Sequence, residues 1–190
     1  MPRRCLSCLV AVLALIAGSA VADPAAWRSE WPNTDFEKAT VEFHSILSGG
    51  PPKDGIPSID APTFTSVLDA SFVEPNEPVL SLNHNGFARA YPVQILMWHE
   101  IVNDTVGNEA IAVTYCPLCN SGIAFRATID GAATQFGTTG KLRKSDLVMY
   151  DRTTESWWQQ FTGEAIVGAL TGHELQTIPL RMEAFSAFAA

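Results

Sequence analysis

Two cysteines, Cys116 and Cys119, are the residues whose type and spacing most directly suggest chemistry in this sequence. They lie in the stretch TYCPLCNSG, three positions apart, with a proline between them. Asn120 follows and can adopt the left-handed backbone conformation that a tight turn often requires. Such a turn aims both sulfurs at one point, which is typical of half of a metal-binding knuckle. The same spacing also fits a small structural disulfide or a thiol redox pair.

A closed metal site would need two further ligands, because the chain has no second C-x-x-C motif. His99 is the favoured third ligand, since the segment WHEIVND precedes the strand that is expected to deliver Cys116. A histidine at a helix end can equally serve as a hydrogen-bonded structural residue. Glu100, Asp104 and Met149 are less favoured candidate ligands. Soft thiolate ligands suit copper or zinc, and the spacing does not choose between these two metals.

Redox and nucleophilic chemistry are the alternatives at the same cysteines. In thioredoxin-like enzymes the C-x-x-C motif opens a helix that lowers the pKa of its first cysteine. Here NSGIAFRATI follows, with the alternation of a strand, which weakens that interpretation. Haem attachment is excluded because Asn120 stands where a histidine would be needed. A cysteine nucleophile with His99 as its base stays open, although no local signature supports it.

The sequence assigns no catalytic residue. It contains no G-x-S-x-G elbow, no H-E-x-x-H motif, no glycine-rich phosphate loop and no dinucleotide fingerprint, so no nucleotide cofactor is expected. Three functions therefore remain compatible with the residues. The favoured one is a protein that binds a soft metal at Cys116, Cys119 and His99. The others are a thiol-disulfide oxidoreductase and a non-enzymatic interaction domain with a Cys116–Cys119 disulfide.

The elements around the cysteines are mostly strands. Asn85-Gly86 lies between two β-type runs and predicts a tight hairpin turn. The segment VQILMWHE, after Pro92, predicts a short helix that ends near His99. The stretch EIVNDTVGN is interpreted as a turn, with Asn103-Asp104 capping or turning the chain. The apolar run AIAVTY then predicts a strand that leads into Cys116.

The predicted fold class is α+β and β-rich, a mostly antiparallel sheet or partly open barrel with one or two short helices. Further strands are expected at IAFRATI, LVMYD, SWWQQF, AIVGAL and LQTIP. The proline- and glycine-rich stretch GGPPKDGIPSIDAPTF is too broken for regular structure and predicts an irregular loop over the domain.

The N-terminus predicts export. Residues 1–22 carry two arginines, an apolar run and an A-V-A boundary before Asp23, which together are typical of a cleaved signal peptide. The apolar run is shorter than the roughly 20 residues that span a bilayer, so no integral membrane segment is expected after cleavage. Cleavage would also remove Cys5 and Cys8. We therefore expect a periplasmic or secreted protein.

Cleavage would make the remaining chain strongly acidic. Without Arg3 and Arg4, 10 of the 12 basic residues remain against 20 acidic ones, a formal charge of −10. This charge disfavours nucleic acid as a partner, and no other partner can be named. Residues 23–53 are expected to form a lead-in segment on the edge of a domain that covers 54–190.

Several stretches resemble the bacterial family of exported proteins named domain of unknown function 3179 (DUF3179). They include DGIPSIDAPTF, NGFARAYPVQIL, WHEIVND, AIAVTYCPLCNSGIAF, FGTTGKL and SDLVMYDRTTESWWQQFTGEAIVG. The resemblance covers about Asp54 to Pro179 and implies a periplasmic or secreted protein without an established activity. Members of the family usually continue well past the point where RMEAFSAFAA ends this chain, so a copy truncated at the C-terminus is expected.

Overall fold

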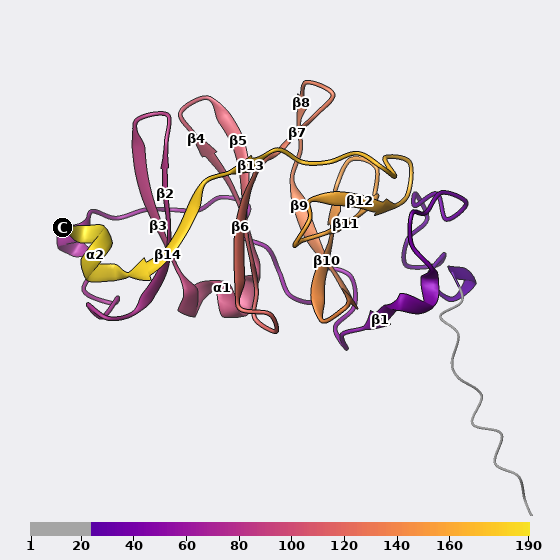
Figure 1. Cartoon of the computed structure of the whole chain (residues 1–190), viewed down its shortest axis with the longest axis horizontal. Coiled ribbons are helices and arrows are strands. Elements are labelled where there is room, and N and C mark those ends of the chain that lie inside the picture. The colour runs from indigo at the N-terminus through magenta and orange to yellow at the C-terminus, as the bar shows by residue number, and fades with distance from the viewer. Residues whose placement is uncertain (1–23) are drawn as a thin grey trace, which may run out of the picture.

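The computed structural model describes residues 24–190, so the predicted signal peptide at 1–22 lies outside the described residues. Three antiparallel sheets follow one another along the long axis of the molecule (Figure 1). The predicted α+β, β-rich class is confirmed, as open antiparallel sheets with two short α-helices.

The middle sheet carries the cysteine motif. Its strand order is β13-β6-β5-β4, and its strands are β4 (Ile101–Val106), β5 (Glu109–Cys116), β6 (Ser121–Arg126) and β13 (Thr177–Ile178). Strand β5 is the predicted AIAVTY strand, and Cys116 is its last residue. The prediction that residues 100–108 form only a turn is wrong, because β4 pairs with β5 over its whole length.

Tertiary contacts explain why Asn103 and Asp104 lie in a strand rather than a turn. The side chain of Asn103 donates to the backbone carbonyl of Phe136 and accepts from its N–H, both at 2.8 Å. The carboxylate of Asp104 accepts from the hydroxyl of Tyr91 at 2.7 Å and from the guanidinium of Arg89. Buried polar groups need such partners, and here they come from distant segments.

A five-stranded sheet lies on one side of the middle sheet. Its order is β1-β9-β10-β11-β12, and its strands are β1 (Ile46–Ser48), β9 (Phe136–Arg143), β10 (Asp146–Asp151), β11 (Trp157–Gln159) and β12 (Glu164–Val167). Strand β1 belongs to the lead-in segment and forms one edge of this sheet. A small separate hairpin pairs β7 (Thr128–Ile129) with β8 (Ala132–Ala133).

A three-stranded sheet lies on the other side, in the order β14-β2-β3. Strands β2 (Pro78–His84) and β3 (Phe87–Pro92) form the predicted hairpin, and β14 (Leu180–Ala184) pairs with β2. Asn85 and Gly86 both have positive φ, 52° and 79°, as the predicted turn type requires.

The helices are short. Helix α1 (Val93–His99) confirms the predicted helix, and α2 (Phe185–Ala189) follows β14 at the C-terminal end. Three 3₁₀ turns complete the regular structure: η1 (Pro24–Ala26), η2 (Phe43–Ser45) and η3 (Val67–Asp69). Within residues 24–190, no helix has both the length and the apolar character needed to cross a membrane.

The middle sheet is covered on both faces. One face, with Val102, Val113 and Tyr115, packs with residues of the three-stranded sheet and α1. The other face, with Ile101 and Cys116, packs against the five-stranded sheet. This alternation along β4 and β5 places Cys116 between two sheets.

The loop from 49 to 64 is irregular, as predicted. Its first part lies against the five-stranded sheet, and Ile59 pairs with Val102 at the edge of the middle sheet. The N–H of Asp54 donates to the carbonyl of Thr138 at 2.9 Å. A Cβ on Gly140 would come within 1.9 Å of the carbonyl oxygen of Pro51, so only glycine permits this close approach.

Candidate metal centre

The cysteines lie in the turn between β5 and β6. Cys116 pairs with Ser121 at the end of the two strands, and residues 117–120 form the turn between them. Asn120 has a φ of 49° and so adopts the left-handed conformation that the sequence predicted. Its side-chain oxygen accepts a hydrogen bond from the hydroxyl of Tyr115 at 3.0 Å, which fixes the turn to β5.

The two thiols differ in their surroundings. Cys116 is 1% exposed and packs in an apolar cluster with Phe125, Met149 and Trp158. Cys119 is exposed at the surface of the turn, and both cysteines are free. The turn therefore presents one buried and one accessible sulfur.

Asp146 joins the two sulfurs. It begins β10, directly after a turn in which Lys144 and Ser145 both have positive φ. Ligand atoms of Cys116, Cys119 and Asp146 all lie within 4.8 Å of one another. The Sγ atom of Cys119 is 3.4 Å from Oδ1 of Asp146. Two sulfurs and a carboxylate oxygen thus converge where two sheets meet.

The carboxylate of Asp146 is buried, and hydrogen bonds to one of its oxygens fix its orientation. The residue is 5% exposed. Its Oδ2 atom accepts from the backbone N–H of Phe161 at 2.9 Å and from the side-chain amide of Gln159. Hydrogen bonds to one oxygen of a ligating carboxylate orient the other oxygen, and Oδ1 here faces Cys119.

Gln160 connects the same region to both strands of the cysteine hairpin. Its amide is completely buried and donates to the hydroxyl of Thr114 at 3.0 Å and to the carbonyl of Ser121 at 3.3 Å. Its Oε1 atom accepts from the hydroxyl of Ser121 at 3.0 Å. These three bonds hold the ends of β5 and β6 against the five-stranded sheet.

The local electrostatics disfavour a free thiolate at Cys119. Partial burial of the sulfur, its interaction with Cys116 and the nearby carboxylate of Asp146 raise the pKa of Cys119 to about 12. A reactive cysteine normally has a lowered pKa, supplied by a cation or a helix N-terminus. Strand β6 follows the motif instead of a helix. The site therefore lacks the usual features of an activated nucleophile.

Among the described residues, no other candidate with a nitrogen or carboxylate ligand joins this group. Nδ1 of His99 lies 2.7 Å from the carbonyl oxygen of Pro57. Asp104 is engaged by Tyr91 and Arg89. Burial raises the pKa of the Glu100 carboxyl to about 7, and its backbone carbonyl accepts from the N–H of Tyr115.

Met149, the remaining candidate, packs in the same apolar cluster as Cys116. Asp146, in contrast, was not identified from the sequence. It follows Cys119 by 27 positions and belongs to a different sheet. An acidic residue at the start of the otherwise apolar run LVMY was the one local signal that could have singled it out.

The fold and the site together define a β-rich protein with a thiol–carboxylate cluster between two antiparallel sheets. The chain belongs to the family described as "Protein of unknown function (DUF3179)", which matches residues 53–190. No curated protein and no solved structure matches the chain. The family resemblance seen in the sequence is confirmed, and the chemistry must be argued from the site itself.

Proposed function

We propose that this protein is an exported metal-binding protein that holds one zinc ion at Cys116, Cys119 and Asp146. The observation that carries this proposal is the convergence of three ligand atoms within 4.8 Å at a buried carboxylate. The hydrogen bonds from Phe161 and Gln159 support it, because they fix the orientation that a ligating carboxylate needs.

The donor set favours zinc over copper. Cu(I) prefers soft sulfur donors, whereas Zn(II) accepts thiolate, imidazole and carboxylate ligands together. A carboxylate oxygen beside two sulfurs therefore suits zinc better. Three protein ligands leave a fourth position open, which is the pattern of zinc sites that exchange water or bind a further ligand.

The surroundings of the site support access to that fourth position. Cys119 is exposed, and two neighbouring apolar side chains, Leu118 and Phe161, are 65% and 63% exposed. The raised pKa of Cys119 does not argue against zinc binding. A coordinating thiol loses its proton outright, so a high pKa in the metal-free protein is compatible with thiolate ligation.

Thiol-disulfide exchange is the second candidate function. The buried Cys116 and the accessible Cys119 favour it, because exchange needs one accessible attacking thiol and one partner thiol. The raised pKa of Cys119 and the strand that follows the motif disfavour it. The third possibility is a non-enzymatic interaction domain that a Cys116–Cys119 disulfide stabilises. The thiol count described below distinguishes this possibility from metal binding.

The metal content of reduced, anaerobically purified protein tests the proposal. Wild-type protein loaded with Zn(II) and passed through a desalting column should retain about one equivalent, counted by elemental analysis. Cys119→Ser should abolish this retention. His99→Ala tests the sequence-based ligand assignment and should leave zinc retention unchanged, because His99 lies outside the group of three ligands.

A thiol count on the same preparation separates the alternatives. Thiols that become reactive after a chelator indicate metal ligation, whereas thiols that appear only after a reductant indicate a disulfide. Less than a tenth of an equivalent of zinc in the loaded wild type, or equal retention by Cys119→Ser, would contradict the metal site.

Export is part of the proposal and has its own test. The mature chain should begin at Asp23, and intact-mass measurement of protein from the producing cell would show this. Retention of residues 1–22 in a membrane fraction would contradict it.

A further inference from the structure

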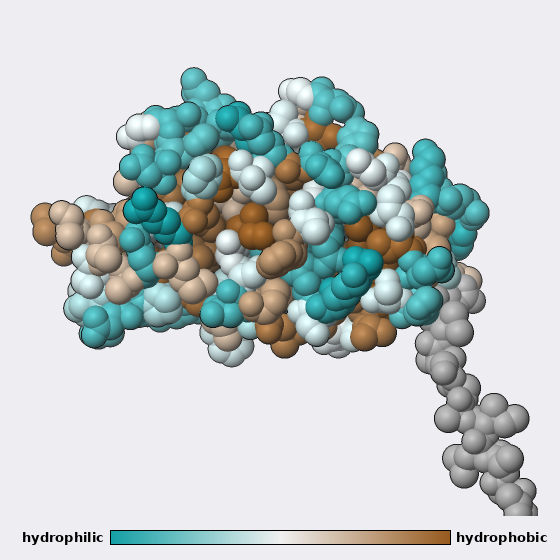
Figure 2. Space-filling view, in the orientation of Figure 1, coloured by the Kyte–Doolittle hydropathy of each residue, from teal (hydrophilic) through white to brown (hydrophobic). Residues whose placement is uncertain are grey.

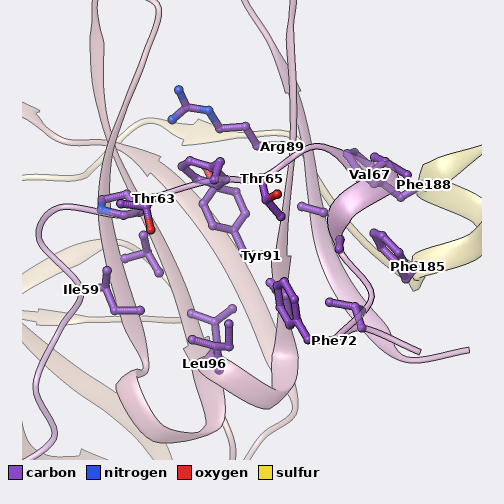
Figure 3. A pocket seen from close by; sticks show the side chains of 18 of the residues that line it. Ile59, Thr63, Thr65, Val67, Phe72, Arg89, Tyr91, Leu96, Phe185 and Phe188 are labelled. Atoms are coloured by element: carbon purple, nitrogen blue, oxygen red, sulfur yellow. The ribbon is translucent and has the colours of Figure 1, made fainter. Parts of the chain in front are cut away.

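A second site is suggested by a cavity at the opposite side of the middle sheet from the cysteines. The cavity measures about 800 Å³ and lies between the segment 59–73, strand β3 and helix α1, with α2 at its edge (Figure 3). Pockets that take small molecules typically measure about 300–1,000 Å³. None of Cys116, Cys119 and Asp146 lines it, so this inference does not depend on the proposed metal site.

The wall of the cavity is mainly apolar and aromatic. Five aromatic side chains contribute to it: Phe64, Phe72, Tyr91, Phe185 and Phe188. Phe64 and Phe72 remain 45% and 57% exposed. Apolar residues also gather over the end of the molecule where α2 lies (Figure 2). A concave apolar surface of this size is unfavourable in water and is typical of a ligand site.

One end of the cavity is polar. Arg89 lies there, apart from Leu96 and Phe72 (Figure 3). Its guanidinium stacks over the ring of Phe64, with Cζ 4.5 Å from the ring centroid. Nη1 donates to Asp104 and to the carbonyl of Thr105, at 3.0 Å for the carbonyl. The hydroxyl of Tyr91 also interacts with the guanidinium, and the donors that Asp104, Thr105 and Tyr91 leave free can bind a ligand acceptor.

The charge balance decides what kind of acceptor fits. Arg89 is the only charged residue in the described cavity wall, and the buried carboxylate of Asp104 already neutralises it. Burial and the neighbouring Asp104 raise the pKa of Tyr91, so its hydroxyl stays protonated and adds no charge. An anionic ligand would approach Asp104 without a surplus cation to offset the repulsion. An uncharged acceptor meets no such cost.

We propose that this cavity binds an uncharged amphiphile whose apolar chain lies against Phe72 and Leu96 and whose carbonyl oxygen accepts hydrogen bonds from Arg89. Esters and amides of long-chain acids belong to this class. The apolar chain supplies most of the affinity, and the Arg89 contact fixes the orientation.

The first experiment tests occupancy of the cavity with 1,6-diphenylhexatriene, a hydrocarbon probe that fluoresces in apolar surroundings. Thr65 lines the cavity but is exposed, so it can be replaced without disturbing the core. Wild-type protein and the Thr65→Ser control should bind the probe equally. Thr65→Trp, which places a large ring at the wall of the cavity, should weaken binding at least tenfold. Equal binding by Thr65→Trp would overturn the site.

The second experiment tests the head group with a matched pair of competitors. Monododecanoylglycerol should displace the probe at lower concentration than dodecanoate at pH 8, both below their micelle-forming concentrations. Tighter binding of dodecanoate would overturn the assignment to an uncharged ligand.

The third experiment tests Arg89 as the residue that determines specificity. Arg89→Lys keeps the charge opposite Asp104 but loses the second planar donor edge. The variant should bind monododecanoylglycerol about tenfold more weakly, as expected for one or two lost hydrogen bonds. Its affinity for the hydrocarbon probe should stay within a factor of two of the wild-type value. An equal loss for both compounds would overturn the assignment of head-group recognition to Arg89.

The remaining occupant to test is a second copy of this chain. Analytical ultracentrifugation should give a monomer with and without monododecanoylglycerol. A dimer that Thr65→Trp dissociates and that binds no probe would assign the cavity to a protein interface and overturn the proposal.

Discussion

Two hairpin turns of this protein show how differently a turn can be determined. The turn at Asn85-Gly86 joins β2 and β3 with two residues at positive φ, and a Cβ on Gly86 would meet no atom within 4 Å. The turn after Cys116 joins β5 and β6 and is held by Gln160 and Tyr115, with the carboxylate of Asp146 against its second cysteine. The first turn has the backbone conformation that its own two residues favour, and its contact with the middle sheet is the hydrogen bond from the Asn85 side chain to Glu109 at 3.1 Å. The second turn depends on several side chains of a neighbouring sheet.

This difference fits the roles that we assign to them. A turn that only reverses the chain needs the backbone conformations of asparagine and glycine. A turn that positions ligand atoms needs supporting side chains, because a site on an unsupported loop lacks the required geometry. The following predictions test whether the cysteine turn depends on its tertiary support and the glycine turn does not.

The largest expected effect is on zinc affinity in Asp146→Asn. The amide keeps the size of the side chain but removes the anionic ligand, so the dissociation constant for zinc should rise by more than roughly 100-fold, beyond the usual effect of losing an outer-shell partner. Competition with a chromogenic zinc chelator measures it. Asp130→Asn, at an exposed turn where asparagine tolerates positive φ, is the matched control. Similar affinities in both variants would remove Asp146 from the site.

Gln160→Ala should produce the next largest effect, a loss of about 3 kcal/mol in the free energy of unfolding. The substitution leaves a cavity in place of the fully buried Gln160 side chain and removes one hydrogen-bond partner from Thr114 and one from Ser121. Urea unfolding measures it, with the exposed Gln176→Ala as control. Zinc affinity should fall as well, because the cysteine turn loses its support. A stable variant with full zinc affinity would show that the turn is locally determined.

Glu100→Gln should raise the free energy of unfolding at pH 8 by roughly 1–3 kcal/mol relative to the wild type. Burial raises the pKa of Glu100 from 4.5 to about 7 in the folded protein. The folded state then binds the proton more tightly than the unfolded state, so stability falls as pH rises from about 4.5 to 7. The variant should therefore gain stability over the wild type at pH 8 and little at pH 4.

Unfolding in urea at both pH values measures this effect, with the exposed Glu174→Gln as the comparison. A gain of the same size at pH 4 and pH 8 would mean that the carboxyl of Glu100 does not titrate in this range.

Gly86→Val should have the smallest effect, a destabilisation of about 1–2 kcal/mol from backbone strain at positive φ. Thermal unfolding measures it, and Gly86→Asn should recover most of the loss because asparagine tolerates this conformation. Zinc affinity should not change. An unchanged melting temperature in Gly86→Val would contradict the conformational account of this turn.

The locally determined parts of the fold could be predicted from the sequence. The hairpin at Asn85-Gly86 and the helix that ends at His99 follow from residues within a few positions of each other. The strand before Cys116 and the left-handed Asn120 follow from local patterns in the same way.

Strand β4 could not be predicted because its polar residues find their partners elsewhere. Asn103-Asp104 has the composition of a turn, but Phe136 and Tyr91 supply the hydrogen bonds that allow both residues to be buried in a strand. Asp146 could not be predicted as a ligand for the same reason. Its approach to Cys119 depends on the packing of two sheets, which no local pattern contains.

The absorption spectrum of the reduced protein loaded with Co(II) tests the central claim most directly. Cobalt can replace zinc as a spectroscopic probe, and its thiolate charge-transfer band reports how many sulfurs it binds. If Cys116 and Cys119 share one ion with Asp146, the wild type should show this band together with the strong visible bands of four-coordinate cobalt. Cys116→Ser and Cys119→Ser should each keep about half of the charge-transfer intensity or less, because each removes one of two thiolates. Asp146→Asn should keep the charge-transfer band and shift the visible bands. A wild-type spectrum without thiolate charge transfer, unchanged in the cysteine variants, would contradict the metal centre.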